Sequence, residues 1–259
     1  MKQDSSSADK VELRCPRSWL ELSPRQLQRM LRLVHTCKTE ERLRLRALCM
    51  LTGLKVISQV PGGWHCALRH GLRLRHFFLR TWQFHSMAMQ LSWTDTTEGI
   101  PVRMGCMGGR TCACDRMLHG LPFGSYLRAE QQYQLFLLHR KPRFLRQLFD
   151  TLYPKPRRRR LFQRVQPWHI TAAFLWFMYC KQMLSREFPW FFRPADEQAD
   201  DSFDLIAQYN LQVRALTQGD ITKEAYILQM DCWRALTELN AKAREGAELK
   251  QKLEKTKQS

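Results

Sequence analysis

Residues Gly120–Arg140 have the sequence GLPFGSYLRAEQQYQLFLLHR, which combines a helix start with an unbroken helical pattern. Glycine and proline at its beginning interrupt the preceding chain, and proline is favoured at the start of a helix. Apolar side chains then recur every three or four residues, interrupted at Glu130, as on a helix with one buried face. These apolar positions are Phe123, Tyr126, Leu127, Tyr133, Leu135, Leu137 and Leu138. We therefore expect a central helix with other helices packed on both sides of it.

An αα-hairpin is expected near the N-terminus. Ser23-Pro24 is a strong helix start, and Thr39 followed by two glutamates starts a second helix. The arginines predicted on the outer face of this pair are Arg25, Arg29, Arg32, Arg42, Arg44 and Arg46. A basic helix pair of this kind is typical of a solvated surface, and it can also dock on nucleic acid.

The rest of the chain is also mostly helical in pattern. Pro167 begins a long helix to about residue 187 that is apolar on nearly all sides, as in the buried centre of a bundle. Two more helices are expected at about 203–217 and 221–250. Within residues 54–80, alternating apolar residues predict two short strands with Pro61-Gly-Gly between them. The predicted fold class is mainly α, a helical bundle with a small β element in the N-terminal half.

A basic, proline-bounded stretch from Pro154 to Arg160 marks the predicted domain boundary, because it cannot contribute to a core. We predict five regions on this basis. They are a disordered lead (1–18), a basic α-rich domain (19–153), a basic linker (154–166), a helical subdomain that packs on the first (167–250) and a solvated tail (251–259).

The net charge of +18 is uneven along the 259 residues. Residues 1–170 contain 30 Lys and Arg against 11 Asp and Glu, whereas residues 171–259 contain 12 against 13. A positive field favours phosphate backbones, anionic surfaces or an acidic protein partner. The same charge also suits a merely solvated surface, and the composition does not separate these alternatives.

The nine cysteines are odd in number and scattered, which indicates free thiols in a reducing compartment. The polar N-terminus and the absence of an apolar run long enough to span a bilayer predict a cytoplasmic protein without a membrane span. One cluster has metal-ligand character, Cys106, Cys112, Cys114 and His119. Zinc prefers four such ligands, but the usual pair of Cys-x2–4-Cys knuckles is missing. A glycine-rich loop with free thiols is the alternative reading, with no cofactor.

Two further groups are candidate contact sites for a protein partner or nucleic acid. The first is the densest basic cluster, which has aromatic residues nearby that can stack on bases. The second is an aromatic run after the long helix. The residues are Arg157, Arg158, Arg159, Arg160 and Arg164 in the first group and Trp190, Phe191 and Phe192 in the second. The sequence contains no nucleophile elbow, zinc-protease motif or phosphate loop, so we expect a protein that is not an enzyme.

Two stretches, Arg214–Arg244 and Leu121–Leu137, resemble a pattern in uncharacterised proteins of phages, prophages and related mobile elements of gut anaerobic bacteria. The resemblance covers helix surfaces and contains no catalytic motif. It implies a virion or tail-module setting, in which mainly α accessory and assembly proteins occur.

We therefore expect a non-enzymatic α-helical interaction protein, a structural or assembly component of a phage-like element. Its expected partners are other phage or mobile-element proteins, in the host cytoplasm or in a virion or tail assembly, and self-association stays open. The first alternative is a nucleic-acid-binding accessory protein that uses the basic N-terminal two thirds. The second alternative is a zinc-stabilised module.

Overall fold

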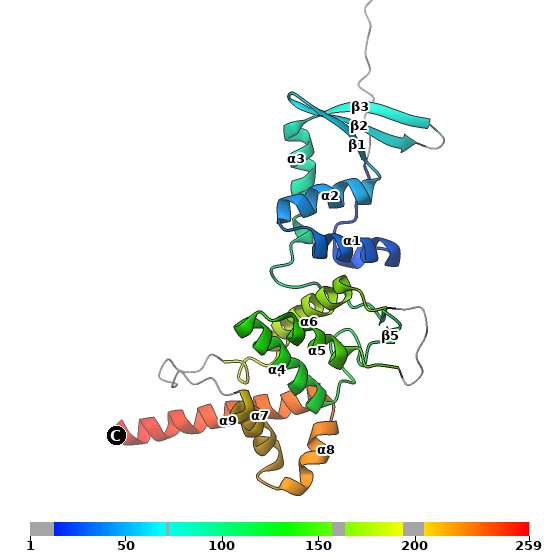
Figure 1. The fold of residues 1–259 in the computed structure, drawn as a ribbon. Helices are drawn as coiled ribbons and strands as arrows, with labels where there is room; N and C mark the ends of the chain where they lie inside the picture. The colour runs from blue at the N-terminus through cyan, green and yellow to red at the C-terminus, as the bar shows by residue number, and fades with distance from the viewer. Residues whose placement is uncertain (1–12, 71–72, 157–163, 194–204, 259) are drawn as a thin grey trace, which may run out of the picture. The chain divides into compact units, whose positions relative to one another are not determined.

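The computed structural model describes residues 13–70, 73–156, 164–193 and 205–258. The chain forms two compact units, Met1–Asp95 and Thr96–Ser259. Helices predominate in the described residues, and a three-stranded sheet lies in the N-terminal unit (Figure 1), which confirms the predicted fold class. The elements are η1 (Trp19–Glu21), α1 (Pro24–Thr36), α2 (Glu40–Thr52), β1 (Lys55–Val60), β2 (Gly63–His70), β3 (Arg73–Arg80), α3 (Thr81–Met89), η2 (Ser92–Thr94), β4 (Cys106–Met107), β5 (Arg110–Thr111), α4 (Phe123–His139), α5 (Pro142–Leu152), α6 (Pro167–Glu187), α7 (Leu205–Thr217), η3 (Ile221–Lys223), α8 (Glu224–Gln229) and α9 (Cys232–Gln258).

The first two helices begin at the caps that the sequence predicts. The Ser23 hydroxyl accepts the Gln26 N–H at 3.4 Å, and the Gln26 side chain accepts the Ser23 N–H at 3.0 Å, which closes a capping box before α1. Thr39 caps α2 by accepting the Arg42 N–H. Gly53 ends α2 at a φ of 75°, in the left-handed region that glycine adopts without steric cost. Local signals therefore position both helices of the predicted hairpin.

The sheet has the order β1-β2-β3, and both neighbouring pairs are antiparallel. The sequence predicts two strands, and the structure has three, because β2 pairs with β3 along its whole length and with β1 from Gly63 to Ala67. The predicted turn at Pro61-Gly62 joins β1 to β2. Cys66 and Ala67 of the central strand are buried, and the Trp64 ring lies 5.6 Å from the Phe84 ring of α3. The sheet therefore contributes to the core of this unit.

The core of the C-terminal unit forms around α4, α5 and α6 (Figure 1). Helix α4 occupies most of the expected central helix. Its Tyr133 ring stacks on Phe174 of α6 with centroids 5.6 Å apart. The largest fully buried side chains of this unit include Trp176, Tyr126, Tyr153, Phe123, Phe149 and Phe177. Aromatic packing between these helices therefore dominates the core, as the nearly all-apolar pattern of α6 predicts.

Two tryptophans hold the loop that precedes α4. The Trp176 indole N–H donates to the Arg116 carbonyl at 2.9 Å, and the Trp233 indole N–H donates to the Met117 carbonyl at 2.6 Å. The buried Cys232 thiol donates to the Leu118 carbonyl at 3.2 Å. Because these donors come from α6 and α9, both helices fix the backbone from which α4 starts.

The predicted helix over residues 221–250 is divided in the structure into η3, α8 and α9. The break falls at Met230 and Asp231. The Phe123 N–H donates to the Met230 carbonyl at 2.7 Å, and the Cys232 N–H donates to the Leu121 carbonyl at 2.9 Å. These contacts with the start of α4 use backbone groups that a continuous helix would need for itself.

The observed division of the chain differs from the predicted one. The two units meet in sequence at Asp95 and Thr96, not at the basic stretch 154–166. Helices on both sides of that stretch belong to one core, because α5 packs on α6 and the Phe136 ring of α4 lies 5.3 Å from Phe174 of α6. A basic, proline-bounded sequence therefore connects two helices of the same unit.

The ends of the described chain also refine the predictions. The backbone N–H of Arg17, within the predicted disordered lead, donates to the Glu21 carboxylate at 2.7 Å. Residues 1–12 of that lead lie outside the described residues. Helix α9 continues to Gln258, so the predicted solvated tail is helical. In the part of the chain that the structure describes, no helix is both long and apolar enough to cross a membrane.

Candidate functional site

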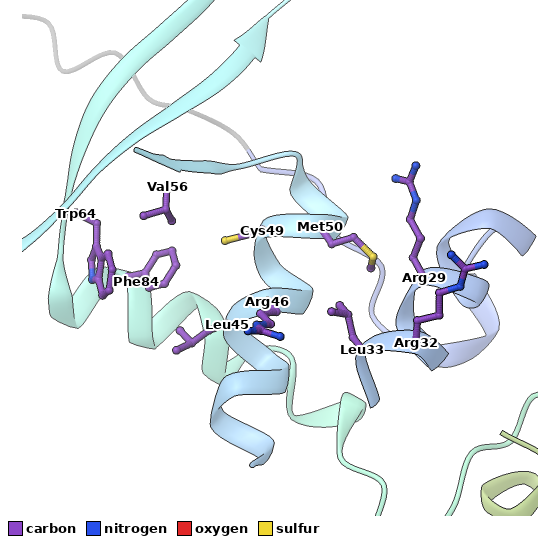
Figure 2. Close-up of a pocket in the computed structure, with 10 residues that line it drawn as sticks. All are labelled: Arg29, Arg32, Leu33, Leu45, Arg46, Cys49, Met50, Val56, Trp64 and Phe84. Atoms are coloured by element: carbon purple, nitrogen blue, oxygen red, sulfur yellow. The ribbon is translucent and has the colours of Figure 1, made fainter. Parts of the chain in front are cut away.

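An apolar groove lies in the N-terminal unit, where α1, α2 and α3 meet the first two strands. Its volume is about 810 Å³. Figure 2 shows Trp64, Phe84 and Val56 at one end and Arg29 and Arg32 at the other, with residues of α2 between them. The lining side chains are Arg29, Arg32, Leu33, Leu45, Arg46, Cys49, Met50, Val56, Trp64 and Phe84.

Helix α2 contributes most to the groove because it is apolar on two sides. The side chains that it buries in the core are Leu43, Ala47, Leu48 and Leu51. Leu45, Cys49 and Met50 lie on a neighbouring side, are half-buried and line the groove. A helix that only covers a core needs one apolar face. The second apolar side of α2 therefore provides a surface that suits a binding partner.

Three arginines give the edge of the groove a positive charge. Arg29, Arg32 and Arg46 are exposed, and none of the ten lining residues is acidic. The sequence also placed Arg44 on the outer face of the hairpin, but its guanidinium binds the Asp95 carboxylate through contacts of 2.6 and 3.0 Å. Arg44 is therefore part of a structural ion pair and does not line the groove.

The groove lining is suited to binding apolar and anionic groups. Cys49 is the one lining side chain with a nucleophilic atom, and burial raises the pKa of its thiol. A protonated thiol is a weak nucleophile and behaves as a small apolar group. The apolar lining can accept a partner's apolar side chains, while the guanidinium groups can bind carboxylates or phosphates.

The four predicted zinc ligands do not form a ligand set. The sulfur atoms of Cys112 and Cys114 lie 3.9 Å apart. Cys106, however, is exposed on β4, and the His119 ring stacks on Trp233 with centroids 4.3 Å apart. Among the residues that the structure describes, no group of three or more His, Cys, Asp or Glu is placed to hold a metal ion. The arrangement does not fit the tetrahedral site that structural zinc requires.

The predicted aromatic run is attached to the fold of the C-terminal unit. The Asn240 side-chain oxygen of α9 accepts the N–H groups of Trp190 at 2.9 Å and Phe191 at 3.1 Å. The Lys181 ammonium lies 4.8 Å from the centre of the Phe192 ring. Trp190 is the most exposed of the three aromatic residues, at 38%. The run therefore has partners within its own chain, and Trp190 presents the largest free surface.

The predicted basic cluster falls largely outside the described residues. Arg157, Arg158, Arg159 and Arg160 are not among them, so their role as a contact site stays a prediction. Arg164 is described, and it is exposed shortly before α6 begins.

Sequence reasoning identified the arginines of the groove but not its apolar lining. The signal in α2 was the second set of apolar residues, Leu45, Cys49 and Met50, which the expected core face does not use. Trp64 and Phe84 come together only when the sheet folds onto α3. Their contact depends on the strand register, which no local pattern of the sequence specifies.

In comparisons with known proteins, no family model, no curated protein and no solved structure matches the chain.

Proposed function

We propose that this chain is a non-enzymatic interaction protein, an assembly component of a phage-like element, whose N-terminal unit docks an acidic amphipathic helix of a partner protein. One observation carries the docking proposal: the groove combines an apolar lining with three exposed arginines and no lining carboxylate. The resemblance of Arg214–Arg244 and Leu121–Leu137 to mobile-element proteins supports the assembly setting.

Apolar contacts would provide most of the affinity. Burial of one large apolar side chain contributes about 1.5–3 kcal/mol, whereas an exposed ion pair contributes roughly 0.2–1 kcal/mol. Two or three apolar anchors over Leu45, Met50 and Val56 therefore outweigh the arginine contacts. The arginines would instead orient the partner and raise its association rate, because charge complementarity acts chiefly on encounter and specificity.

The chemistry of the groove defines the partner. A helix that fills it presents apolar side chains at three- and four-residue spacing, as in other helix-in-groove complexes. Carboxylates beside that stripe would face Arg29 and Arg32 at one end and Arg46 along α2. A helix with lysines at the same positions would place like charges together and bind poorly.

Two fluorescent synthetic helices with identical apolar positions test this proposal. One carries glutamates beside the apolar stripe and the other carries lysines. We expect the acidic helix to bind the full chain at least about tenfold more tightly in fluorescence anisotropy, because each repelled contact adds to the difference. The double substitution Arg29→Glu with Arg46→Glu should reverse the preference. Met50→Gln, which leaves the charge unchanged, should weaken both complexes.

Arg25→Glu with Arg42→Glu is the matched control. These residues lie on the same two helices, are exposed and change the charge equally, but they do not line the groove. Binding of the acidic helix should be nearly unchanged in this variant. Equal losses in both double variants would refute docking in the groove and leave only general attraction to a basic surface.

Nucleic-acid binding is the second candidate function. Residues 13–95 contain 14 Lys and Arg against 4 Asp and Glu. In addition, β3 carries the exposed Phe78, at 44%, between the exposed Arg73 and Arg80. Basic strands with an exposed aromatic ring suit contact with phosphates and bases.

The same anisotropy assay separates the two functions when it uses labelled single- and double-stranded oligonucleotides. Phosphate binding should weaken steeply between about 50 and 200 mM salt. Both double variants, in the groove and outside it, should then reduce binding by a similar factor. Binding that is weak at every salt concentration would exclude this candidate.

A further inference from the structure

Two thiols face each other in the C-terminal unit, outside the groove. The sulfur atoms of Cys112 and Cys114 are 3.9 Å apart, in the loop that follows β5. A disulfide bond requires a separation of about 2.05 Å. Cys112 is partly exposed and Cys114 is buried, so a reagent from solvent reaches Cys112 first.

The backbone around the two thiols is fixed on both sides. The Cys112 N–H donates, at 3.0 Å, to the carbonyl of Gly105, the residue that precedes β4. The Ala113 N–H donates to the Leu152 carbonyl at 2.9 Å, at the end of α5. These bonds hold the short loop in place, so the contact between the two sulfur atoms is part of the fold.

The surroundings make the two thiols unequal. A hydrogen bond from the Cys114 thiol, with smaller contributions from the Cys114 N–H and the Arg103 guanidinium, lowers the pKa of Cys112 to about 6 against the opposing effect of burial. The same hydrogen bond, together with burial, raises the pKa of Cys114. Cys112, which is also the more exposed of the two, is therefore the attacking thiol, and Cys114 is the buried neighbour that can resolve an adduct.

We propose that Cys112 and Cys114 form a redox-modifiable dithiol, which a low-molecular-weight disulfide such as oxidised glutathione converts into an intramolecular disulfide bond. The Cys112 thiolate attacks one sulfur of oxidised glutathione. The glutathione disulfide bond breaks, and one glutathione leaves as a thiolate and takes up a proton. Cys112 is then bound to the other glutathione.

Cys114 completes the exchange. Once Cys112 is in the mixed disulfide, the hydrogen bond between the two side chains is lost, and with it the largest cause of the raised pKa of Cys114. Cys114 loses its proton, attacks the Cys112 sulfur and displaces the second glutathione. The dithiol gives up two electrons and two protons, and oxidised glutathione takes up both as two molecules of reduced glutathione.

To test this proposal, the full reduced chain is treated with oxidised glutathione. Mass spectrometry then measures the mass of the intact chain and of its Thr111–Arg116 tryptic peptide. The wild-type chain should lose the mass of two hydrogens within this peptide. Cys114→Ser and Cys114→Ala should instead accumulate one glutathione on Cys112, and Cys112→Ser should prevent both products. Cys106→Ser, which removes an exposed thiol close in sequence, is the matched control and should still form the disulfide.

Two results would overturn the proposal. The first is a wild-type chain that keeps glutathione on Cys112 without forming the intramolecular bond. The second is a disulfide that joins Cys112 to a cysteine other than Cys114, for example a bond to Cys106 that is lost in Cys106→Ser. Far-UV circular dichroism of each reduced variant shows that it has folded, and two different replacements of Cys114 guard against an effect of one side chain.

Discussion

Cys112 shows how one neighbouring thiol can change the acid–base state of a side chain. The lowered pKa, about 6, means that its thiolate persists at a lower pH than an ordinary cysteine thiolate. We expect alkylation of Cys112 by iodoacetamide to be nearly constant from pH 8 to pH 7 and to fall to half near the pKa. A free thiol with a pKa of about 8.5 loses roughly tenfold in rate per pH unit over the same range. Mass spectrometry of the Thr111–Arg116 peptide measures the rate.

Two substitutions separate the causes of this shift. Cys114→Ala removes the hydrogen bond that lowers the pKa of Cys112 most, so the alkylation midpoint should move to higher pH. Arg103→Met should move the midpoint less, because the guanidinium contributes less to the lowered pKa. A wild-type midpoint near that of a free thiol would contradict the assignment of Cys112 as the attacking thiolate. The proximity of the two sulfur atoms would then have no chemical consequence at neutral pH.

Helix α9 begins where one carboxylate joins two segments of the C-terminal unit. The Asp231 side chain accepts the Trp233 N–H at 2.9 Å and also the Gly120 N–H, ahead of α4. Asp231→Ala removes both acceptors. We expect the free energy of unfolding to fall by about 1–2 kcal/mol, the usual effect of losing a helix cap. Urea denaturation followed by circular dichroism measures the change.

Asp220→Ala provides the comparison for Asp231→Ala. Asp220 likewise accepts an N–H, that of Thr222 at 3.0 Å, but it opens the short η3 turn at an exposed site, where its other partners are the Thr222 hydroxyl and Lys223 of the same turn. Asp220→Ala should therefore lower the free energy of unfolding clearly less than Asp231→Ala does. Asp231→Asn keeps one acceptor oxygen, so its effect on the free energy of unfolding should lie between those of the two alanine substitutions. Equal effects would show that the contact with Gly120 contributes nothing to the unit.

Local signals made the starts of several elements predictable from the sequence. Ser23 and Thr39 cap their helices through contacts within three residues, and Pro167 begins α6 as expected. The break at Met230 could not be predicted, because the groups that cause it belong to the start of α4, more than 100 residues earlier. The third strand was missed for a related reason, since β2 is defined by pairing with two other strands.

At the scale of the whole molecule, the positions of charged side chains were easier to predict from the sequence than the contacts between residues distant in the chain. The arginines at the edge of the groove follow from the sequence, whereas the meeting of Trp64 with Phe84 depends on tertiary structure. The predicted boundary at residues 154–166 differs from the division between Asp95 and Thr96 because it, too, depends on tertiary contacts. A linker-like composition at residues 154–166 says nothing about whether the helices on its two sides share a core, as α5 and α6 do.

The division of the chain between Asp95 and Thr96 predicts which fragments can fold. A fragment of residues 96–259 retains α4, α5 and α6 together, so it should unfold cooperatively in urea and keep its far-UV helical signal. A fragment of residues 167–259 retains α6 but loses the α4 rings that stack on Phe174 and the α5 residues that pack beside them. Its exposed aromatic face should leave it without a cooperative transition, because most helical stability comes from packing of an apolar face. The opposite result, with cooperative unfolding only in the shorter fragment, would restore the boundary at residues 154–166 and contradict a core shared by α4, α5 and α6.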